Sequence, residues 1–228
     1  MLRIRGPFSN REEAGAELAA RLRERAWRNP IVFALPRGGV PVAFEIASAL
    51  RAPLDVVLVR KIGAPMQKEL AIGAITDGNP PHIFIDPQLV SALGVRQSYI
   101  QQETARQLDE IKRRRDLYGV AASPALLQGK SAIVVDDGIA TGATMRVALH
   151  ALKARKPDAL ILAIPVAPRE SLEELKRAVD SIVCLQSPEY FPGVGAFYSD
   201  FAQVDDSEVV DLLRRSRDWL ESSRGMRT

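Results

Sequence analysis

Two adjacent carboxylates follow an apolar run, and a loop of small and hydroxyl residues comes after them. The run is Ile133-Val134-Val135, the acids are Asp136 and Asp137, and the loop extends from Gly138 to Thr144. Three β-branched residues predict a buried strand, so both acids would lie at its carboxyl end. A helical pattern follows the loop, and the first N–H groups of a helix bind anions because they have no partner within the helix. The carboxylates can accept hydrogen bonds from sugar hydroxyls, and the adjacent N–H groups can donate to a phosphate. Together they predict a sugar phosphate as the ligand.

The loop has features of an anion site of its own. Thr141 and Thr144 add hydroxyl donors, and Gly142 and Ala143 allow a ligand to approach the backbone. The spacing G-x-x-x-x-G-K-[ST] of nucleoside triphosphatases is absent, and the loop contains no lysine. The acid pair could also hold hydrated Mg2+, which prefers carboxylate and water oxygens. A strand end with acids capping a helix is the alternative, and the complete arrangement favours a ligand site.

A second turn stands after an earlier strand pattern. Arg37, Gly38 and Gly39 follow the apolar residues 31–35 and precede a helical pattern. Arginine brings a fork of donors that matches phosphate oxygens, and glycine permits a close approach. Taken alone, these residues favour a tight strand-to-helix turn over an anion site.

These segments resemble a known family. Residues 134–144 are similar to the phosphoribosyl-pyrophosphate motif of the type I phosphoribosyltransferases. The resemblance implies that Asp136 and Asp137 contact the ribose hydroxyls, with Mg2+ nearby. It implies that the 5′-phosphate is held by the loop residues Ala140, Thr141, Gly142, Ala143 and Thr144. It also places the family's pyrophosphate loop, which often contains a cis peptide bond, at Arg37, Gly38 and Gly39.

The resemblance further implies a mobile lid over residues 60–69. Arg60 and Lys61 would join Arg37 in neutralising the leaving pyrophosphate, and Glu69 would be the candidate general base. Gly63 would serve as a hinge. An ordinary surface loop with solvated charges is an equal alternative for this segment.

The implied activity is transfer of a phosphoribosyl group to a nitrogenous acceptor, as in nucleotide metabolism. Enzymes for 6-oxopurines tend to carry an acid where Ala140 stands, whereas adenine enzymes carry alanine, so the first expectation is a purine-like base other than hypoxanthine or guanine. Phe191 and Tyr190 follow the last strand pattern, and Phe191 could stack on the base. For Phe197 and Phe201, a small satellite core is favoured.

The order of elements predicts the fold class and one domain over residues 1–228. Strand patterns at residues 31–35, 56–59, 133–135, 160–166 and 182–185 alternate with helical patterns, which favours an α/β fold with a mostly parallel sheet flanked by helices. Residues 70–76 and 82–85 predict a hairpin before a long helix at 98–118. Further helices are expected at residues 10–28, 41–50, 169–179 and 205–220. The expected core is residues 31–185, the hood residues 1–30 and 186–204, and the C-terminal helix residues 205–221.

The composition excludes several classes of protein. The net charge of +3 is too small to predict nucleic-acid binding, and the basic run 112–115 sits in a helical pattern typical of a solvated face. The single cysteine, Cys184, lies in an apolar run, which predicts a buried thiol and a cytoplasmic protein. No apolar run reaches the ~20 residues of a membrane span. His82 and His150 show no metal-ligand spacing and are interpreted as structural.

Three functional classes therefore remain. The first is a Mg2+-dependent transferase that uses phosphoribosyl pyrophosphate and a small acceptor, with a homodimer as the common assembly of the fold. The second is a regulatory protein that only senses phosphoribosyl pyrophosphate. The third and weakest is a hydrolase of a phosphorylated sugar.

Overall fold

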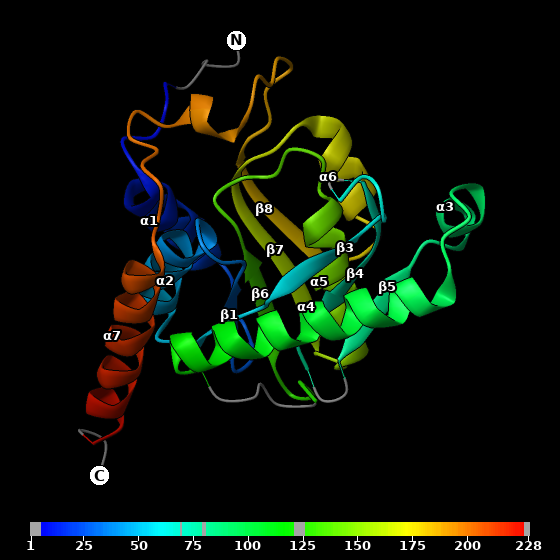
Figure 1. Ribbon diagram of the computed structural model, residues 1–228. Helices are drawn as coiled ribbons and strands as arrows, with labels where there is room; N and C mark the ends of the chain where they lie inside the picture. Colours follow the sequence, from blue (N-terminus) through cyan, green and yellow to red (C-terminus); the bar gives the residue numbers. More distant parts are fainter. Residues whose placement is uncertain (1–5, 69, 79–80, 121–125, 226–228) are drawn as a thin grey trace.

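A parallel five-stranded sheet forms the centre of the molecule in the computed structural model, which describes residues 6–68, 70–78, 81–120 and 126–225 (Figure 1). All neighbouring strands in this sheet run parallel. From one edge to the other, its strands are β2 (Leu54–Val56), β1 (Ile31–Ala34), β6 (Ser131–Val135), β7 (Ala159–Val166) and β8 (Ser181–Gln186). The α/β class predicted from the sequence is confirmed.

Helices cover both faces of this sheet. Residues Val32 and Ala34 of β1 face a core shared with α1 (Arg11–Leu22), α2 (Gly39–Leu50) and α7 (Asp206–Gly225). The alternate residues of β1 face a second core with α5 (Ala143–Ala154) and α6 (Arg169–Leu175). Because both faces are buried, the strands are continuous apolar runs.

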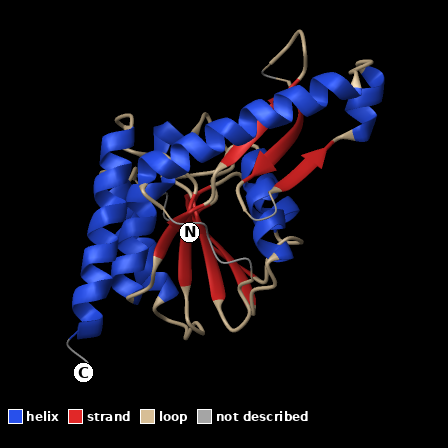
Figure 2. Cartoon of the chain, turned by 60° about the horizontal axis from the view of Figure 1, so that its bottom comes forward, coloured by secondary structure: helices blue, strands red, loops and turns tan. Residues whose placement is uncertain are grey.

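A second sheet stands beside the first. It is antiparallel, with β4 (Ala71–Thr76) between β3 (Val59–Gly63) and β5 (His82–Ile85). The long helix α4 (Gln97–Tyr118) lies across it, as Figure 2 shows. The predicted hairpin of β4 and β5 is confirmed, and β3 pairs with β4 as an additional strand.

The strand predicted at residues 56–59 is divided between the two sheets. Val56 ends β2 and pairs with β1, whereas Val59 begins β3 and pairs with Thr76 of β4. The first four residues of the predicted lid therefore lie in a strand. Gly63, the predicted hinge, accepts a hydrogen bond from the Tyr99 hydroxyl at 2.9 Å through its carbonyl.

Some helix ends differ from the prediction. Helix α1 ends at Leu22 and not near residue 28, and the Trp27 indole N–H donates to the Leu22 carbonyl at 2.8 Å. Helix α6 ends at Leu175 and not at 179. The unpredicted helix α3 (Pro87–Ala92) begins after Asp86, whose side chain accepts from two backbone N–H groups, a common N-terminal cap.

Residues 8–9 and 191–202 lie together within the hood predicted at residues 1–30 and 186–204, and from here on the term hood means these two segments. Phe8 forms an isolated bridge with Tyr198, and the 3-10 helix η1 (Val194–Phe197) lies within this region. The Phe8 N–H donates to the Phe197 carbonyl at 2.8 Å. In Figure 1 the hood lies above the carboxyl end of the parallel sheet. Within the described residues, no helix has the length and apolar character to cross a membrane.

Candidate active site

The two turns singled out in the sequence meet at the carboxyl ends of β1 and β6. These strands are neighbours, and the Leu35 N–H donates to the Val135 carbonyl at 2.9 Å. A Cβ atom on Gly38 would overlap the Asp137 carboxylate, and one on Gly39 would lie 2.8 Å from the Val135 carbonyl oxygen. The peptide bond between Pro36 and Arg37 is cis, as the resemblance implied. The structure therefore brings the arginine turn into contact with the acid pair.

The phosphate loop is open to solvent at the start of α5. Ala140, Thr141, Ala143 and Thr144 are exposed, and no side chain caps the helix. Gly142 precedes the helix with φ of 71°, a conformation that favours glycine. The backbone N–H groups of this first turn are thus available for an anion.

Arg11, which was not predicted, reaches the acid pair from α1. Its Nε and Nη2 atoms lie 2.9 Å and 2.8 Å from Oδ2 of Asp137. Its Nη1 donates to the Ala202 carbonyl at 2.8 Å, and its guanidinium carbon is 3.9 Å from the centroid of the Phe201 ring. The Tyr198 hydroxyl donates to the Asp137 carbonyl at 2.6 Å. Arg11 of α1 therefore holds the side chain of Asp137, and Tyr198 of the hood holds its backbone.

A signal for Arg11 exists in the sequence. Arg11 shares the buried face of α1 with Ala14, Gly15, Leu18, Ala19 and Leu22. It thus occupies a position that the helical period assigns to the core, in a helix turn where the dipole favours acids over bases. A buried cation at such a position requires an anionic partner from elsewhere in the chain.

The two acids have different electrostatic environments. Burial raises the pKa of Asp136 well above its usual range, and the adjacent Asp137 charge raises it further. Burial also raises the pKa of Asp137, but the Arg11 charge and hydrogen bonds oppose that shift. The Asp137 N–H donates to Asp136 Oδ1 at 2.9 Å. Arg11 therefore favours the anionic form of Asp137 in particular.

Comparison with known proteins agrees with this geometry. The family model described as the phosphoribosyl transferase domain matches residues 8–200. The chain belongs to this family. A crystal structure of the protein TT1426 from Thermus thermophilus is 40% identical, covers 92% of this chain and 98% of its own, and has a TM-score of 0.78.

Curated relatives point to the same family. "Putative phosphoribosyl transferase Rv0571c" of Mycobacterium tuberculosis H37Rv is 40% identical over 216 residues, which is 94% of this chain. Its counterpart MT0597 in strain CDC 1551 gives the same values. The chain covers 48% of each, so it spans about half the length of the curated relatives it matches.

Arg60 and Lys61, the two cations predicted for the lid of this phosphoribosyl transferase domain, lie on opposite faces of β3. Arg60 Nε donates to Oε1 of Gln107 on α4 at 3.0 Å, and burial, followed by the Arg114 charge, lowers the pKa of Arg60. Lys61 lines a cavity of about 350 Å³ together with Ala143 and Thr144. Neighbouring strand residues point to opposite faces, so the structure groups Lys61 with the phosphate loop and Arg60 with α4.

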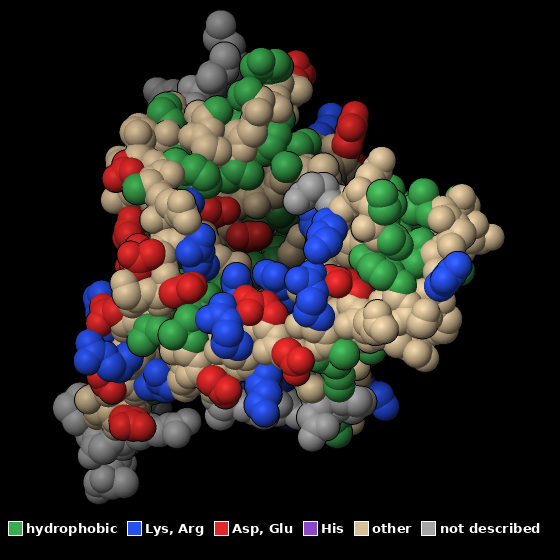
Figure 3. Space-filling model, in the orientation of Figure 1, with side chains coloured by type: hydrophobic (Ala, Val, Ile, Leu, Met, Phe, Trp, Pro, Cys, Tyr) green, Lys and Arg blue, Asp and Glu red, His purple; other side chains and the backbone are tan. Residues whose placement is uncertain are grey.

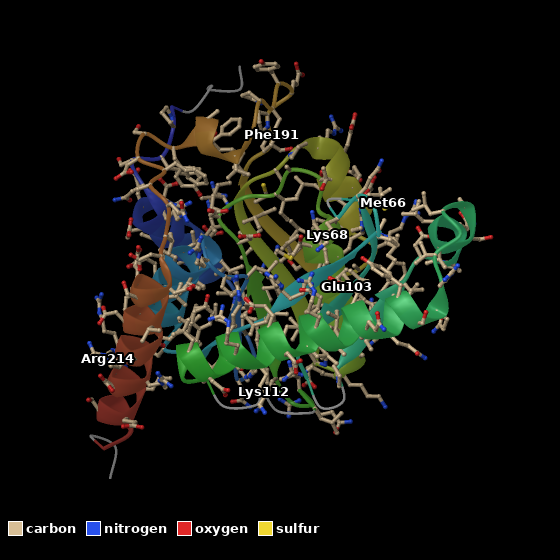
Figure 4. All side chains as sticks on the ribbon, viewed as in Figure 1. Met66, Lys68, Glu103, Lys112, Phe191 and Arg214 are labelled. Carbon is tan, nitrogen blue, oxygen red and sulfur yellow. The ribbon has the colours of Figure 1, made fainter. Side chains whose placement is uncertain are left out.

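The remaining predicted residues are distributed around the site. No described residue hydrogen-bonds the half-buried Arg37 guanidinium, whose charge acts on Asp205 and Tyr118. Phe191 stacks on Phe197 with ring centroids 5.3 Å apart, in the upper part of Figure 4. Glu69, the candidate base, lies outside the described residues.

The satellite core predicted for Phe197 and Phe201 is found for Phe197 but not for Phe201. Phe197 joins a small cluster with Phe8 and Tyr198, which confirms the satellite core. Phe201 contacts the Tyr198 ring at 5.0 Å, but its own face covers Arg11, and it remains 37% exposed. Tyr190 is 81% exposed.

Residues outside the site are consistent with structural roles. Arg113 and Arg114 of the basic run bind Glu110 and lower its pKa to about 2, while Arg115 pairs with Asp77. Figure 4 shows Lys112 of the same run on the outer side of α4, opposite Glu103. Lys112 and Arg113 are exposed as predicted, whereas the Arg115 side chain is only 13% exposed, so the prediction of a solvated face is wrong for that end of the run.

Cys184 and the two histidines have different surroundings, and both histidines line the cavity that contains Lys61. Burial raises the pKa of the Cys184 thiol to about 11, so the thiol stays protonated at neutral pH. His82 and His150 were expected apart, but the fold brings their rings to 4.8 Å. Among the described residues, no three His, Cys, Asp or Glu side chains form a group that could hold a metal.

Proposed function

We propose that this protein transfers a phosphoribosyl group from phosphoribosyl pyrophosphate to a nitrogenous acceptor, most simply a nucleobase, in the cytoplasm. The contact between the acid pair and the arginine turn carries this proposal. Gly38 presses against Asp137, so groups suited to ribose and to pyrophosphate are adjacent. Figure 3 shows a hollow at the centre of this face, with acidic and basic side chains around it.

In this proposal the acid pair and the phosphate loop bind different parts of phosphoribosyl pyrophosphate. Asp136 and Asp137 would accept hydrogen bonds from the vicinal ribose hydroxyls at the buried edge of the sheet. The open N–H groups of residues 140–144, with the Thr141 and Thr144 hydroxyls, would hold the 5′-phosphate, and exposed Lys61 adds charge on the same side. Such positioning supplies a large share of catalysis in reactions of this kind.

Departure of pyrophosphate requires positive charge where negative charge develops. Arg37 supplies it from the turn beside the acids, since no described side chain neutralises its guanidinium by a hydrogen bond. We assign Gly38 and Gly39 the role of admitting the ligand to the backbone of this turn. Arg60 would act from the α4 side of β3 if the segment after β3 closes over the site.

The acid pair also fits a magnesium ion that arrives with the donor. Arg11 occupies one Asp137 oxygen and the Asp137 N–H occupies one Asp136 oxygen, so the protein offers few ligands by itself. Mg2+ commonly keeps several waters and binds through one or two carboxylates plus substrate phosphates. When bound, the ion would neutralise charge on the departing pyrophosphate.

The acceptor is assigned to the hood. The Phe191 ring, stacked on Phe197, offers a flat surface near the carboxyl end of the sheet. Ala140 has no group that moves a proton, which favours an acceptor other than hypoxanthine or guanine. We also propose that residues 1–228 form one domain and that the protein is a homodimer.

Pyrophosphate release tests the proposal. The protein is incubated with Mg2+, radiolabelled phosphoribosyl pyrophosphate and each nucleobase in turn, and we expect one base to yield pyrophosphate and a labelled nucleotide. Tight donor binding without release for any base would replace the transferase with a sensor. Release without an acceptor would replace it with a hydrolase.

A further inference from the structure

Arg11 is the most constrained charged side chain beside the donor site. It comes from α1, is only 9% exposed, and contacts residues from two other segments. Two of its nitrogen atoms contact the same oxygen, Oδ2 of Asp137, and the third contacts the Ala202 carbonyl. Each of the three guanidinium nitrogens thus contacts either the acid pair or the hood.

We propose that Arg11 is a positioning residue that fixes the Asp137 carboxylate through Oδ2 and links ribose binding to the hood. This proposal deepens the proposed function and rests on it. Because Arg11 uses only Oδ2, its contacts leave Oδ1 for a ribose hydroxyl. The Nε hydrogen bond and the Nη2 ion-pair contact hold Oδ2 from two sides, which the single ammonium of a lysine would not do.

The charges around Asp137 explain why a cation is needed there. The groups that face it are Arg11 from α1, Tyr198 from the hood and Asp136 from its own loop. Two buried neighbouring carboxyl groups resist simultaneous ionisation, and Tyr198 contributes a hydroxyl whose pKa is raised by burial. Arg11 is the one cation among these three groups.

The same side chain connects the site to the hood. The Phe201 ring covers the guanidinium, and the Ala202 carbonyl accepts from it at 2.8 Å. Ribose that orders Asp137 should therefore also order residues 198–202. The acceptor, which is proposed to bind under the hood, would then bind to a hood that donor binding has already ordered.

A ligand-free measurement tests the connection between Arg11 and the hood. Hydrogen exchange in residues 198–202 is compared between the wild type and Arg11→Gln without any ligand. We expect faster exchange in Arg11→Gln, because the Ala202 carbonyl and the Phe201 ring then lose their contacts with the guanidinium. Equal exchange in the two proteins would overturn the proposal.

Donor binding tests the positioning part. Calorimetry with phosphoribosyl pyrophosphate should show at least tenfold weaker binding to Arg11→Gln than to the wild type. Arg11→Lys should recover part of the affinity, since lysine keeps the charge but lacks the fork. Hydrogen exchange in residues 198–202 should slow on donor binding in the wild type and not in Arg11→Gln.

Controls separate the possible failures. Arg28→Gln removes an exposed ion pair with Asp158 and should leave donor affinity unchanged, and thermal melting checks that each variant folds. If Arg11→Gln does not fold, Arg11→Lys supports the same comparison. Equal or tighter donor binding by folded Arg11 variants would overturn the proposal. A wild type that binds no donor would refute the proposed function, while ligand-free hydrogen exchange would still decide whether Arg11 holds the hood.

Discussion

The acid pair and the phosphate loop are consecutive in sequence, but the protein surrounds them differently. Asp137 is held by Arg11 and Tyr198 and touches the turn at Gly38, and its side chain is 14% exposed. The phosphate loop from Ala140 to Thr144 is mostly exposed, and no side chain caps the helix that follows. Segments distant in sequence therefore surround the acid pair, whereas the phosphate loop consists of backbone groups that are consecutive in sequence.

The difference has a physical reason. Helix N–H groups provide donors wherever a helix begins, so a phosphate site needs little support from the rest of the chain. Buried carboxylates lose hydration and repel each other, so they need a cation and hydrogen bonds from other elements. We therefore expect substitutions at the acid end to be more damaging than those at the phosphate end.

The largest effect is expected from changing both acids. Asp136→Asn combined with Asp137→Asn should weaken binding of phosphoribosyl pyrophosphate at least tenfold, about 1.4 kcal/mol, because the amides lose the charge that attracts ribose hydroxyls. Calorimetry measures the affinity. Asp158→Asn, at an acid paired with Arg28, is the matched control. Unchanged affinity in the double variant would remove the ribose assignment.

The next effect concerns the contact between the turn and the acids. In Gly38→Ala the new methyl group would displace the Asp137 carboxylate from Arg11, and the loss of a charged hydrogen bond costs roughly 1.5 kcal/mol, or about tenfold in affinity. Gly6→Ala is the control, because no atom lies within 4 Å of its new methyl group. Equal donor affinities for the two variants would show that the turn and the acid pair are energetically independent.

A smaller effect is expected at the phosphate end. Thr144→Ala removes one hydroxyl donor but keeps the backbone donors, so it should cost roughly 0.5–1.5 kcal/mol of donor binding. Thr104→Ala, on α4, provides a comparison outside the loop. If Thr144→Ala were as damaging as the double acid variant, the proposed contrast between the two ends would be wrong.

The smallest effect is expected for Lys61. Its side chain is exposed, so Lys61→Ala should weaken donor binding by only about 0.2–1 kcal/mol, and the difference should shrink as salt increases. Titrations at low and high salt measure this. A loss independent of salt would indicate a closed site around Lys61, in contrast to the open loop.

Much of this protein could be predicted from residue types and spacing. The apolar runs at residues 31–35 and 133–135 predict buried strands, because both faces of a parallel sheet are covered. The position of the acids at a strand end and of Gly142 at a helix start follows from local sequence.

The partners of these residues could be known only from the tertiary structure. Arg11 is separated from Asp137 by 126 positions, and its pairing depends on how α1 and the hood fold over the sheet. The opposite orientations of Arg60 and Lys61 depend on β3 joining a second sheet rather than forming a loop. Local sequence determined which groups could bind a sugar phosphate, because strand ends and helix starts have local signals. The long-range fold decided which carboxylate is paired with a cation, because that cation comes from the other end of the chain.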